Sequence, residues 1–274
     1  MHFLCLLFLL LAAYVRGSVD ILRAAQLSDA SYYDVETAKL QRPDLAPLLL
    51  DQVPGFPRQV SSSSPAHVWL FASTRTLAIA FRGTASYANV VADMDVFTVS
   101  LSGSDTEVRV HSGFLEEYVA LEAELAEIIG SVFDQFDHIE FAGHSLGGAI
   151  ATIAGASVGV LFPSKTVAVY TIGSPRVGNE AFAAWFRSRV TTSVRWTNAE
   201  DPVPRACPIG PWFVHVHDAE AVDSNLQVET VPDTRGNERL MDTFLHWDRA
   251  SVLFGHSADL YVERLLQLLT FAQV

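Results

Sequence analysis

The sequence predicts a single-domain α/β protein in which helices flank a mostly parallel central sheet. From residue 138 on, apolar strand-like segments alternate with helical ones, which is typical of parallel strands joined by crossover helices. Of the 274 residues, 50% are hydrophobic and 18% are charged, so the chain can bury a large core and is not disordered. Because no linker or repeat divides the sequence, we expect one domain over residues 18–274.

Residues 1–17 are expected to form a signal peptide. The apolar run from Phe3 to Ala13 is shorter than the roughly 20 residues of a membrane-spanning helix. It is followed by Val15-Arg16-Gly17, a suitable cleavage site before Ser18. A retained signal anchor is the alternative, because little positive charge precedes the run. We therefore expect a secreted protein whose mature chain has no transmembrane segment.

The charged residues and the cysteines exclude several classes of protein. The chain has 18 Lys and Arg against 31 Asp and Glu, a formal net charge of −13. A nucleic-acid partner would require a basic face, so no such partner is expected. For the oligomeric state, we take a monomer as the default. Cys5 lies in the expected signal peptide, which leaves Cys207 alone in the mature chain. Since one cysteine cannot form an internal disulfide, core packing must hold the fold.

The part of the chain before residue 137 is expected to contain a helix, a hairpin and a second, longer helix. Val19 to Tyr33 has apolar residues at helical spacing. His67 to Ala72 and Thr76 to Phe81 have a β-rich composition and are joined by three polar residues, which predicts a hairpin. Phe114 to Phe136 combines a broad apolar stripe with glutamates on its other side, the pattern of an amphipathic helix.

The remaining part supplies the predicted parallel strands. We expect strands at His138 to Ala142, Thr166 to Ile172 and Ser193 to Asn198. Helices are expected between them, at Leu146 to Gly159 and at Glu180 to Arg189. Strands that alternate with helices in this way imply a parallel sheet with crossover connections.

A glycine-rich turn separates the first of these strands from its helix. It reads Gly143-His144-Ser145-Leu146-Gly147, the G-x-S-x-G pattern of a nucleophilic serine on a sharp turn. Side chains at the two glycine positions would collide with the neighbouring strand and helix. The backbone N–H of Leu146 would point to the place where an oxyanion forms. A tight turn with an incidental serine is the alternative, but the flanking strand and helix favour an α/β-hydrolase fold with Ser145 as nucleophile.

A nucleophilic serine needs an acid and a base, which in α/β-hydrolases follow it in that order along the chain. Asp201 fits the acid because it comes just after the third predicted strand, in a loop whose prolines prevent further strand pairing. Glu200 is the competing carboxylate, and Asp218 and Asp223 are weaker alternatives.

Four histidines follow the candidate acid. We favour His256 as the base, because it lies in a Gly-His-Ser loop directly before the last amphipathic helix. His246 has apolar neighbours, which indicates a packing role. His215 and His217 alternate on a predicted strand with Asp218 nearby, but without further ligands at suitable spacing we expect no metal site.

Five motifs occur in the order and spacing of one known family, the class 3 lipases. They are Phe81–Thr84, Val110–Phe114, Gly143–Ala149, Gly173–Asn179 and Asp201–Pro204. The sequence resembles this family from about Ala66 to Tyr261. The class 3 lipases are the fungal-type triacylglycerol lipases and include feruloyl esterases and plant relatives. The chain departs from the secreted fungal enzymes in lacking their disulfides.

The resemblance implies roles for individual residues. Ser145 matches the family's nucleophile and Asp201 its acid. His256 matches the base, which is followed by a tyrosine as in the family. Thr84 matches the second oxyanion donor through its backbone N–H, beside the N–H of Leu146. Without the resemblance, Thr84 would be interpreted as an ordinary turn residue.

The segment after this threonine falls where the family carries a lid, a short amphipathic helix that covers the site. Tyr87, Val90 and Val91 could form its apolar face, while Asn89 is polar. A fixed surface helix is the alternative, because periodicity does not distinguish closure from packing. The candidate lid residues are Ser86, Tyr87, Asn89, Val90 and Val91.

The resemblance implies a serine carboxylic-ester hydrolase, in first place a triacylglycerol lipase that forms an acyl-enzyme and needs no cofactor or metal. Its substrate would be a lipid ester at a lipid–water interface, which this acidic chain would contact through the apolar lid rather than through charge. A feruloyl or other non-lipid esterase on the same fold is the alternative. A catalytically inactive hydrolase fold that serves as a binding protein is a weaker one.

Overall fold

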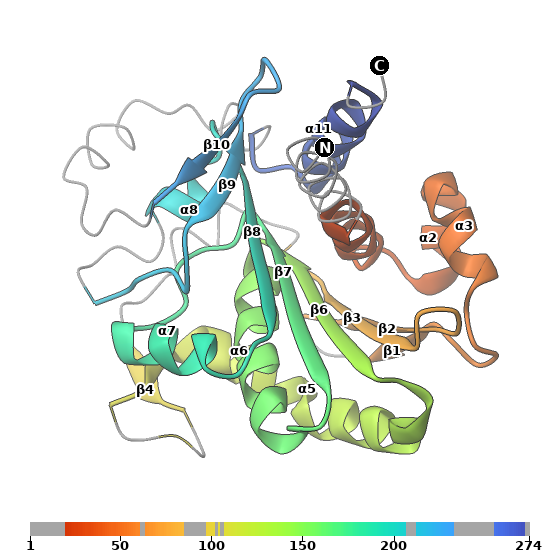
Figure 1. Cartoon of the computed structure of the whole chain (residues 1–274), viewed down its shortest axis with the longest axis horizontal. Helices are drawn as coiled ribbons and strands as arrows, with labels where there is room; N and C mark the ends of the chain where they lie inside the picture. Colours follow the sequence, from red (N-terminus) through yellow and green to blue (C-terminus); the bar gives the residue numbers. More distant parts are fainter. Residues whose placement is uncertain are drawn as a thin grey trace, which may run out of the picture.

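The computed structural model in Figure 1 describes residues 20–60, 64–84, 97–101, 104, 107–206, 212–232 and 255–271. The strands in these ranges are β1 (Arg58–Val60), β2 (Ala66–Phe71), β3 (Thr76–Phe81), β4 (Thr98–Ser100), β5 (Arg109–His111), β6 (His138–His144), β7 (Thr166–Ile172), β8 (Thr192–Asn198), β9 (Ala219–Val222) and β10 (Val228–Val231). The helices are one over residues 20–30, α2 (Val35–Gln41), α3 (Ala46–Leu50), α5 (Ser112–Ser131), α6 (Leu146–Leu161), α7 (Glu180–Arg187), α8 (Val203–Ala206) and α11 (Ala258–Phe271).

Eight of these strands form one twisted sheet in the order β1-β2-β3-β6-β7-β8-β9-β10. Neighbouring strands from β3 to β9 are parallel, whereas β1, β2 and β10 join the sheet in antiparallel pairs. Helices lie on both sides of the sheet (Figure 1). The mostly parallel sheet and its flanking helices confirm the predicted architecture.

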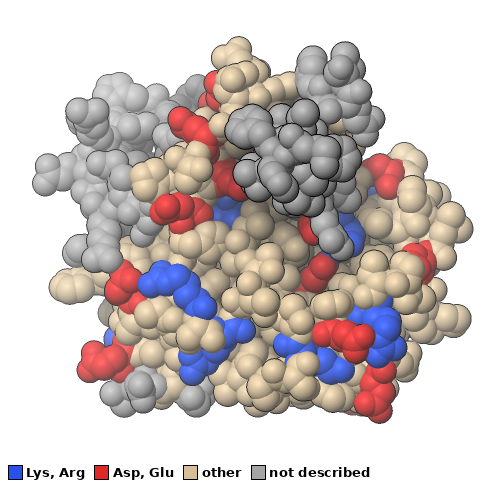
Figure 2. All heavy atoms as spheres, in the orientation of Figure 1, with Lys and Arg blue, Asp and Glu red and all other residues tan. Residues whose placement is uncertain are grey.

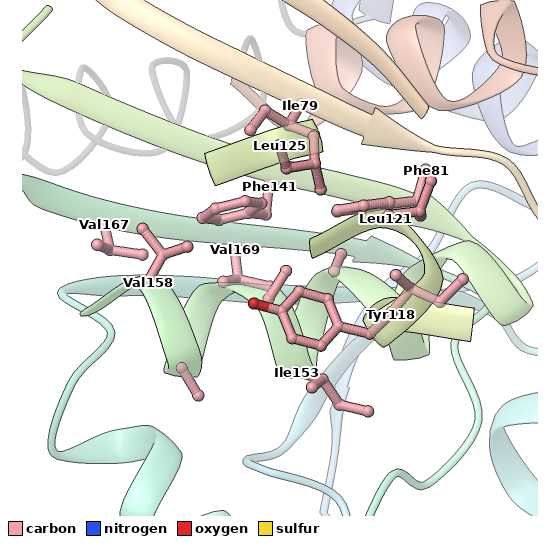
Figure 3. Close-up of a cluster of buried hydrophobic side chains, with 14 of the residues drawn as sticks. Ile79, Phe81, Tyr118, Leu121, Leu125, Phe141, Ile153, Val158, Val167 and Val169 are labelled. Carbon is pink, nitrogen blue, oxygen red and sulfur yellow. The ribbon is translucent and has the colours of Figure 1, made fainter. Parts of the chain in front are cut away.

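The sheet separates two hydrophobic cores. Strands β2 and β3 are buried along their whole length, as expected of strands covered on both faces. On one face, side chains of α5 and α6 pack against β3, β6 and β7, and Figure 3 shows this cluster around Phe141. On the other face, the helix over residues 20–30 and α11 cover the sheet.

Helix α6 fixes the spacing between the helix layer and the sheet. Its sequence is rich in Ala and Gly, and nearly all of its first eleven residues are buried. A β-carbon at Gly155 would clash with Val169 of β7, so only a glycine allows this close approach. The first turn of α6 is therefore held firmly against the carboxyl ends of the parallel strands.

The predicted elements differ from the observed ones mainly at their ends. The β2–β3 hairpin is confirmed, with Leu70 opposite Leu77. The long helix ends at Ser131 and is followed by a separate 3-10 turn at Phe133–Gln135. The prediction that His215 and His217 lie on a strand was wrong, because β9 takes the place beside β8.

Several predicted features lie outside the described residues. These are the signal peptide, His246, Cys207 and the candidate lid residues Ser86, Tyr87, Asn89, Val90 and Val91. In the described part of the chain, no helix is both long and apolar enough to cross a membrane. On the face shown in Figure 2, the basic side chains form small groups next to acidic ones.

His67 of β2 is a buried titratable group that should make the fold sensitive to acid. Its side chain is fully buried near Trp69, and neither ring nitrogen has a hydrogen-bond partner. Burial lowers the pKa of His67 to about 4. An unfolded histidine has a pKa of about 6.5, so between these two values the unfolded chain binds a proton that the folded chain does not.

We expect this difference to lower the free energy of unfolding by about 2 kcal/mol between pH 7 and pH 5. The stabilisation is present above the unfolded-state pKa of His67 and is lost as the pH falls toward the folded-state value. Urea unfolding at both pH values measures the loss. In His67→Leu the drop should be smaller by that amount, and an unchanged pH dependence in this variant would contradict the expectation.

Candidate active site

Ser145 lies on the turn between β6 and α6 in a backbone conformation that side-chain-bearing residues rarely adopt. Its φ is 59° and its ψ is −127°, a strained region that is normally restricted to glycine. The Ser145 N–H donates to the carbonyl oxygen of Ile172, the last residue of β7, at 3.0 Å. The packing of α6 and this hydrogen bond hold the serine at the carboxyl end of the parallel strands.

Glycines make this sharp turn possible. A β-carbon at Gly143 would clash with the backbone of Gly147. One at Gly147 would clash with the carbonyl oxygen of Phe81 in β3. Both positions of the G-x-S-x-G motif therefore exclude side chains for a steric reason, as the sequence indicated.

Three side chains from distant parts of the chain form a continuous hydrogen-bonded series at this turn. His256 Nε2 lies 2.8 Å from Ser145 Oγ, and His256 Nδ1 lies 2.7 Å from Asp201 Oδ2. All three residues are buried. The contacts are short enough for proton transfer between the serine and the histidine, with the carboxylate orienting the ring.

Further donors hold the carboxylate of Asp201. The backbone N–H of Val203 donates to Oδ1 at 2.9 Å, and the hydroxyl of Tyr261 donates to Oδ2 at 2.6 Å. The Tyr261 oxygen in turn accepts the N–H of Asn198 at 2.9 Å. Burial and the charge of Asp201 raise the pKa of Tyr261 well above its usual value, so its hydroxyl stays protonated. These bonds fix the direction in which the carboxylate faces the histidine.

One candidate oxyanion donor lies at this turn and the other lies on the segment after β3. Leu146 is the first residue of α6, where unpaired N–H groups and the helix dipole favour negative charge. Thr84 follows β3, the strand that pairs in parallel with β6. A β-carbon at its neighbour Gly83 would lie 3.2 Å from the Ser145 β-carbon, so the chain before Thr84 passes directly beside the serine.

Comparison with known proteins shows which family the sequence of this chain resembles. The family model for class 3 lipases matches residues 78–210. The chain is 34% identical to a lipase of Rhizomucor miehei over 161 residues, which cover 56% of this chain and 43% of that protein. It is 40% identical to the secreted mono- and diacylglycerol lipase 1 of Fusarium solani over 103 residues, 36% of this chain and 30% of that protein. Over these residues the chain resembles the class 3 lipase family.

A solved structure extends the likeness to most of the chain. It is a triacylglycerol lipase whose catalytic centre is described as a serine protease triad. The two structures have a TM-score of 0.66 at 26% identity, over 86% of this chain and 94% of that one. The likeness confirms the α/β-hydrolase fold. In the sequence matches, by contrast, the chain spans only 43% and 30% of the length of the two curated relatives.

The competing carboxylates lie in other surroundings. Glu200 accepts a hydrogen bond from Arg264 of α11 at 2.7 Å. Asp223 accepts two backbone N–H groups in the turn before β10. Asp218 is exposed on the segment before β9. Among the four candidate acids, the structure places only Asp201 against His256.

His215 and His217 do not join the serine. His215 Nε2 lies 2.6 Å from the carbonyl oxygen of Pro204, and burial lowers the pKa of both histidines. His217 Nε2 lies 2.6 Å from Ser193 Oγ, but its Nδ1 faces the main-chain oxygen of Asp218 instead of a carboxylate. The described residues contain no group of three His, Cys, Asp or Glu that could hold a metal ion.

Sequence reasoning missed two residues, one in contact with His256 and one in contact with that neighbour. His144 Nε2 lies 2.7 Å from the carbonyl oxygen of His256, and His144 Nδ1 lies 2.8 Å from the hydroxyl of Tyr32. His144 occupies a variable position of the G-x-S-x-G motif. Tyr32 lies near the end of the predicted first helix, and no other role was expected for it. A polar residue at a position that must be buried was the one signal that could have identified His144.

Proposed function

We propose that this protein is a secreted carboxylic-ester hydrolase that acts on triacylglycerols through an acyl-enzyme. One observation carries the proposal: the hydrogen-bonded series of Ser145, His256 and Asp201 supplies a nucleophile, a base and an orienting acid. The names of the relatives, a lipase and a secreted mono- and diacylglycerol lipase, support lipid esters as substrates and secretion. The apolar run from Phe3 to Ala13 also supports secretion.

In the first half of the reaction, the serine is acylated. His256 Nε2 accepts the proton of Ser145 as Oγ attacks the ester carbonyl, and Asp201 stabilises the imidazolium that forms. The backbone N–H groups of Thr84 and Leu146 donate to the carbonyl oxygen as it becomes an oxyanion. The intermediate then collapses, and the departing alcohol takes its proton from His256. The product at this stage is an ester between the acyl group and Ser145.

In the second half, water removes the acyl group by the same route. His256 accepts a proton from the water, whose oxygen attacks the acyl carbonyl, and the same two N–H groups hold the oxyanion. Collapse returns the proton to Ser145 Oγ and releases the carboxylic acid. Every step uses only side chains and backbone groups of one chain, so we propose a monomer that requires neither a cofactor nor a metal.

The test compares a soluble ester with an emulsified one. We expect the purified protein to hydrolyse p-nitrophenyl butyrate, and to hydrolyse tributyrin faster once the tributyrin exceeds its solubility and forms droplets. The proposed apolar lid, with Tyr87, Val90 and Val91, would open at that surface. Acid release measured by titration below and above the solubility limit gives the comparison.

Two other outcomes would overturn parts of this proposal. A higher kcat/KM for methyl ferulate than for soluble tributyrin, without a gain at droplets, would assign a non-lipid esterase. Failure of a fluorophosphonate probe to label the wild-type protein, together with no turnover of any ester, would assign an inactive hydrolase fold that serves as a binding protein. Labelling that disappears in Ser145→Ala would support the nucleophile.

A further inference from the structure

We propose that Tyr32 and His144 position the base His256 through a directed chain of hydrogen bonds that starts beside the oxyanion loop. The inference rests on the proposed ester hydrolysis and adds two positioning residues to it. Neither side chain contacts Ser145 Oγ or Asp201 in the hydrogen-bonded series described above. Their role would be to keep the segments that carry the reacting groups in register.

The direction of each bond follows from the atoms involved. A carbonyl oxygen can only accept, so the Nε2 that lies 2.7 Å from the His256 oxygen must carry the proton of His144. Nδ1 of His144 is then an acceptor, and the hydroxyl of Tyr32 donates to it at 2.8 Å. The Tyr32 hydroxyl also lies against Gly83, the residue before Thr84, where a β-carbon would clash with it. The hydrogen bonds therefore run from Tyr32, which lies against the oxyanion loop, through His144 to the base.

The surroundings keep His144 neutral, which this direction requires. Its ring is buried, and the ring centroids of His144 and His256 lie 4.6 Å apart. Burial and the neighbouring His256 hold the pKa of His144 well below its usual value. When His256 takes up the serine proton, its new positive charge therefore meets an uncharged ring instead of a second cation.

The contacts also explain why these two positions suit their residues. His144 follows Gly143 at the end of β6, so its backbone is fixed by the same turn that holds Ser145. Tyr32 comes directly after the helix over residues 20–30 and is tied back to it by its N–H, which donates to the Asp29 oxygen at 3.1 Å. A β-carbon on Gly83 would clash with the Tyr32 hydroxyl, so the loop and the tyrosine are in direct contact.

The first experiment removes the Tyr32 hydroxyl and leaves its ring. In Tyr32→Phe, Nδ1 of His144 loses its donor, so the proton can move to Nδ1 and the bond to the His256 oxygen is lost. A small displacement of a reacting group can cost about a hundredfold in rate, so we expect kcat for p-nitrophenyl butyrate to fall by about ten- to a hundredfold. KM should stay unchanged, because no substrate contact is removed.

The matched control is Tyr33→Phe, the same substitution at the next residue. Tyr33 is half-buried and packs against the core on that face of the sheet, outside the hydrogen-bonded chain. We expect its kcat, its KM and its rate of labelling by a fluorophosphonate to equal the wild-type values. In Tyr32→Phe, the labelling rate of Ser145 should fall together with kcat.

A second pair of variants separates positioning from simple packing. The amide nitrogen of glutamine can take the place of His144 Nε2, whereas asparagine reaches only the place of Nδ1. His144→Gln should therefore keep the donor to the His256 oxygen and keep at least tenfold more activity than His144→Asn. Thermal unfolding of both variants measures the effect of each substitution on packing. If the role of His144 were purely structural, the variant with the higher melting temperature would also have the higher activity.

The outcomes distinguish this inference from the proposed function. If wild-type protein hydrolyses no ester, the proposed function fails. If the wild type is active and Tyr32→Phe equals Tyr33→Phe, or His144→Gln equals His144→Asn, the positioning role is overturned and the function stands. Should Tyr32→Phe fail to fold, the comparison of the two His144 variants still decides.

Discussion

Replacing Ser145 with alanine is expected to lower kcat/KM for p-nitrophenyl butyrate by about a million-fold, to the rate left by binding and the oxyanion donors alone. Alanine has no Oγ to attack the ester, and a water placed near His256 replaces it poorly. The β-carbon is retained, so the backbone of the turn should keep its conformation. Steady-state kinetics measure the loss, and circular dichroism checks that the variant is folded.

The chain offers a matched control for this substitution. Ser193 also lies 2.6 Å from a histidine nitrogen, that of His217. It lies on the regular strand β8, and no carboxylate orients its histidine. Ser193→Ala should therefore hydrolyse the ester at the wild-type rate. Full activity in Ser145→Ala, or its loss in Ser193→Ala, would refute the assignment of the nucleophile.

Replacing Asp201 with asparagine is expected to lower kcat by about ten-thousandfold. The carboxylate accepts three hydrogen bonds: from Val203 N–H on Oδ1, and from Tyr261 and His256 on Oδ2. An amide has an NH₂ group on one side, which would face one of these donors. If it faces His256 Nδ1, the ring must carry its proton on Nε2, and it then cannot accept the proton of Ser145. Single-turnover acylation measures the step directly.

Glu200→Gln is the control for the choice between the two neighbouring carboxylates. Glu200 bonds Arg264 and the backbone N–H of Ser224, away from the histidine. We expect nearly wild-type kcat in this variant, with a slight loss of stability from the weakened pair with Arg264. A larger rate loss in Glu200→Gln than in Asp201→Asn would reverse the assignment of the acid.

The sequence predicted those elements of the fold and of the candidate site that depend on residues close together in the chain. The glycines beside Ser145 indicate the sharp turn. Two β-rich runs with a short connection indicate the hairpin of β2 and β3. Asp201 and His256 follow from the order in which α/β-hydrolases supply their acid and base, because each comes at the end of a recognisable element. The structure brings their side chains together with that serine.

The rest depended on contacts between distant segments, which leave no local pattern. Tyr32 and His144 are 112 residues apart and meet because the first described helix covers the sheet. Strands β9 and β10 are only four residues long, too short for a clear alternation. The predicted strand around His215 was also wrong: residues 215–217 form no strand, and β9 pairs with β8.

The candidate site is not contained in the segment that carries the family match. Residues 78–210 include Ser145 and Asp201, whereas His256 and Tyr32 lie on opposite sides of that range. A chimera that exchanged only this segment with a relative would replace the proposed nucleophile and acid but keep the proposed base and the residues that contact it. Compatibility between the two flanks and the exchanged segment, more than the motif itself, would then decide whether such a chimera works.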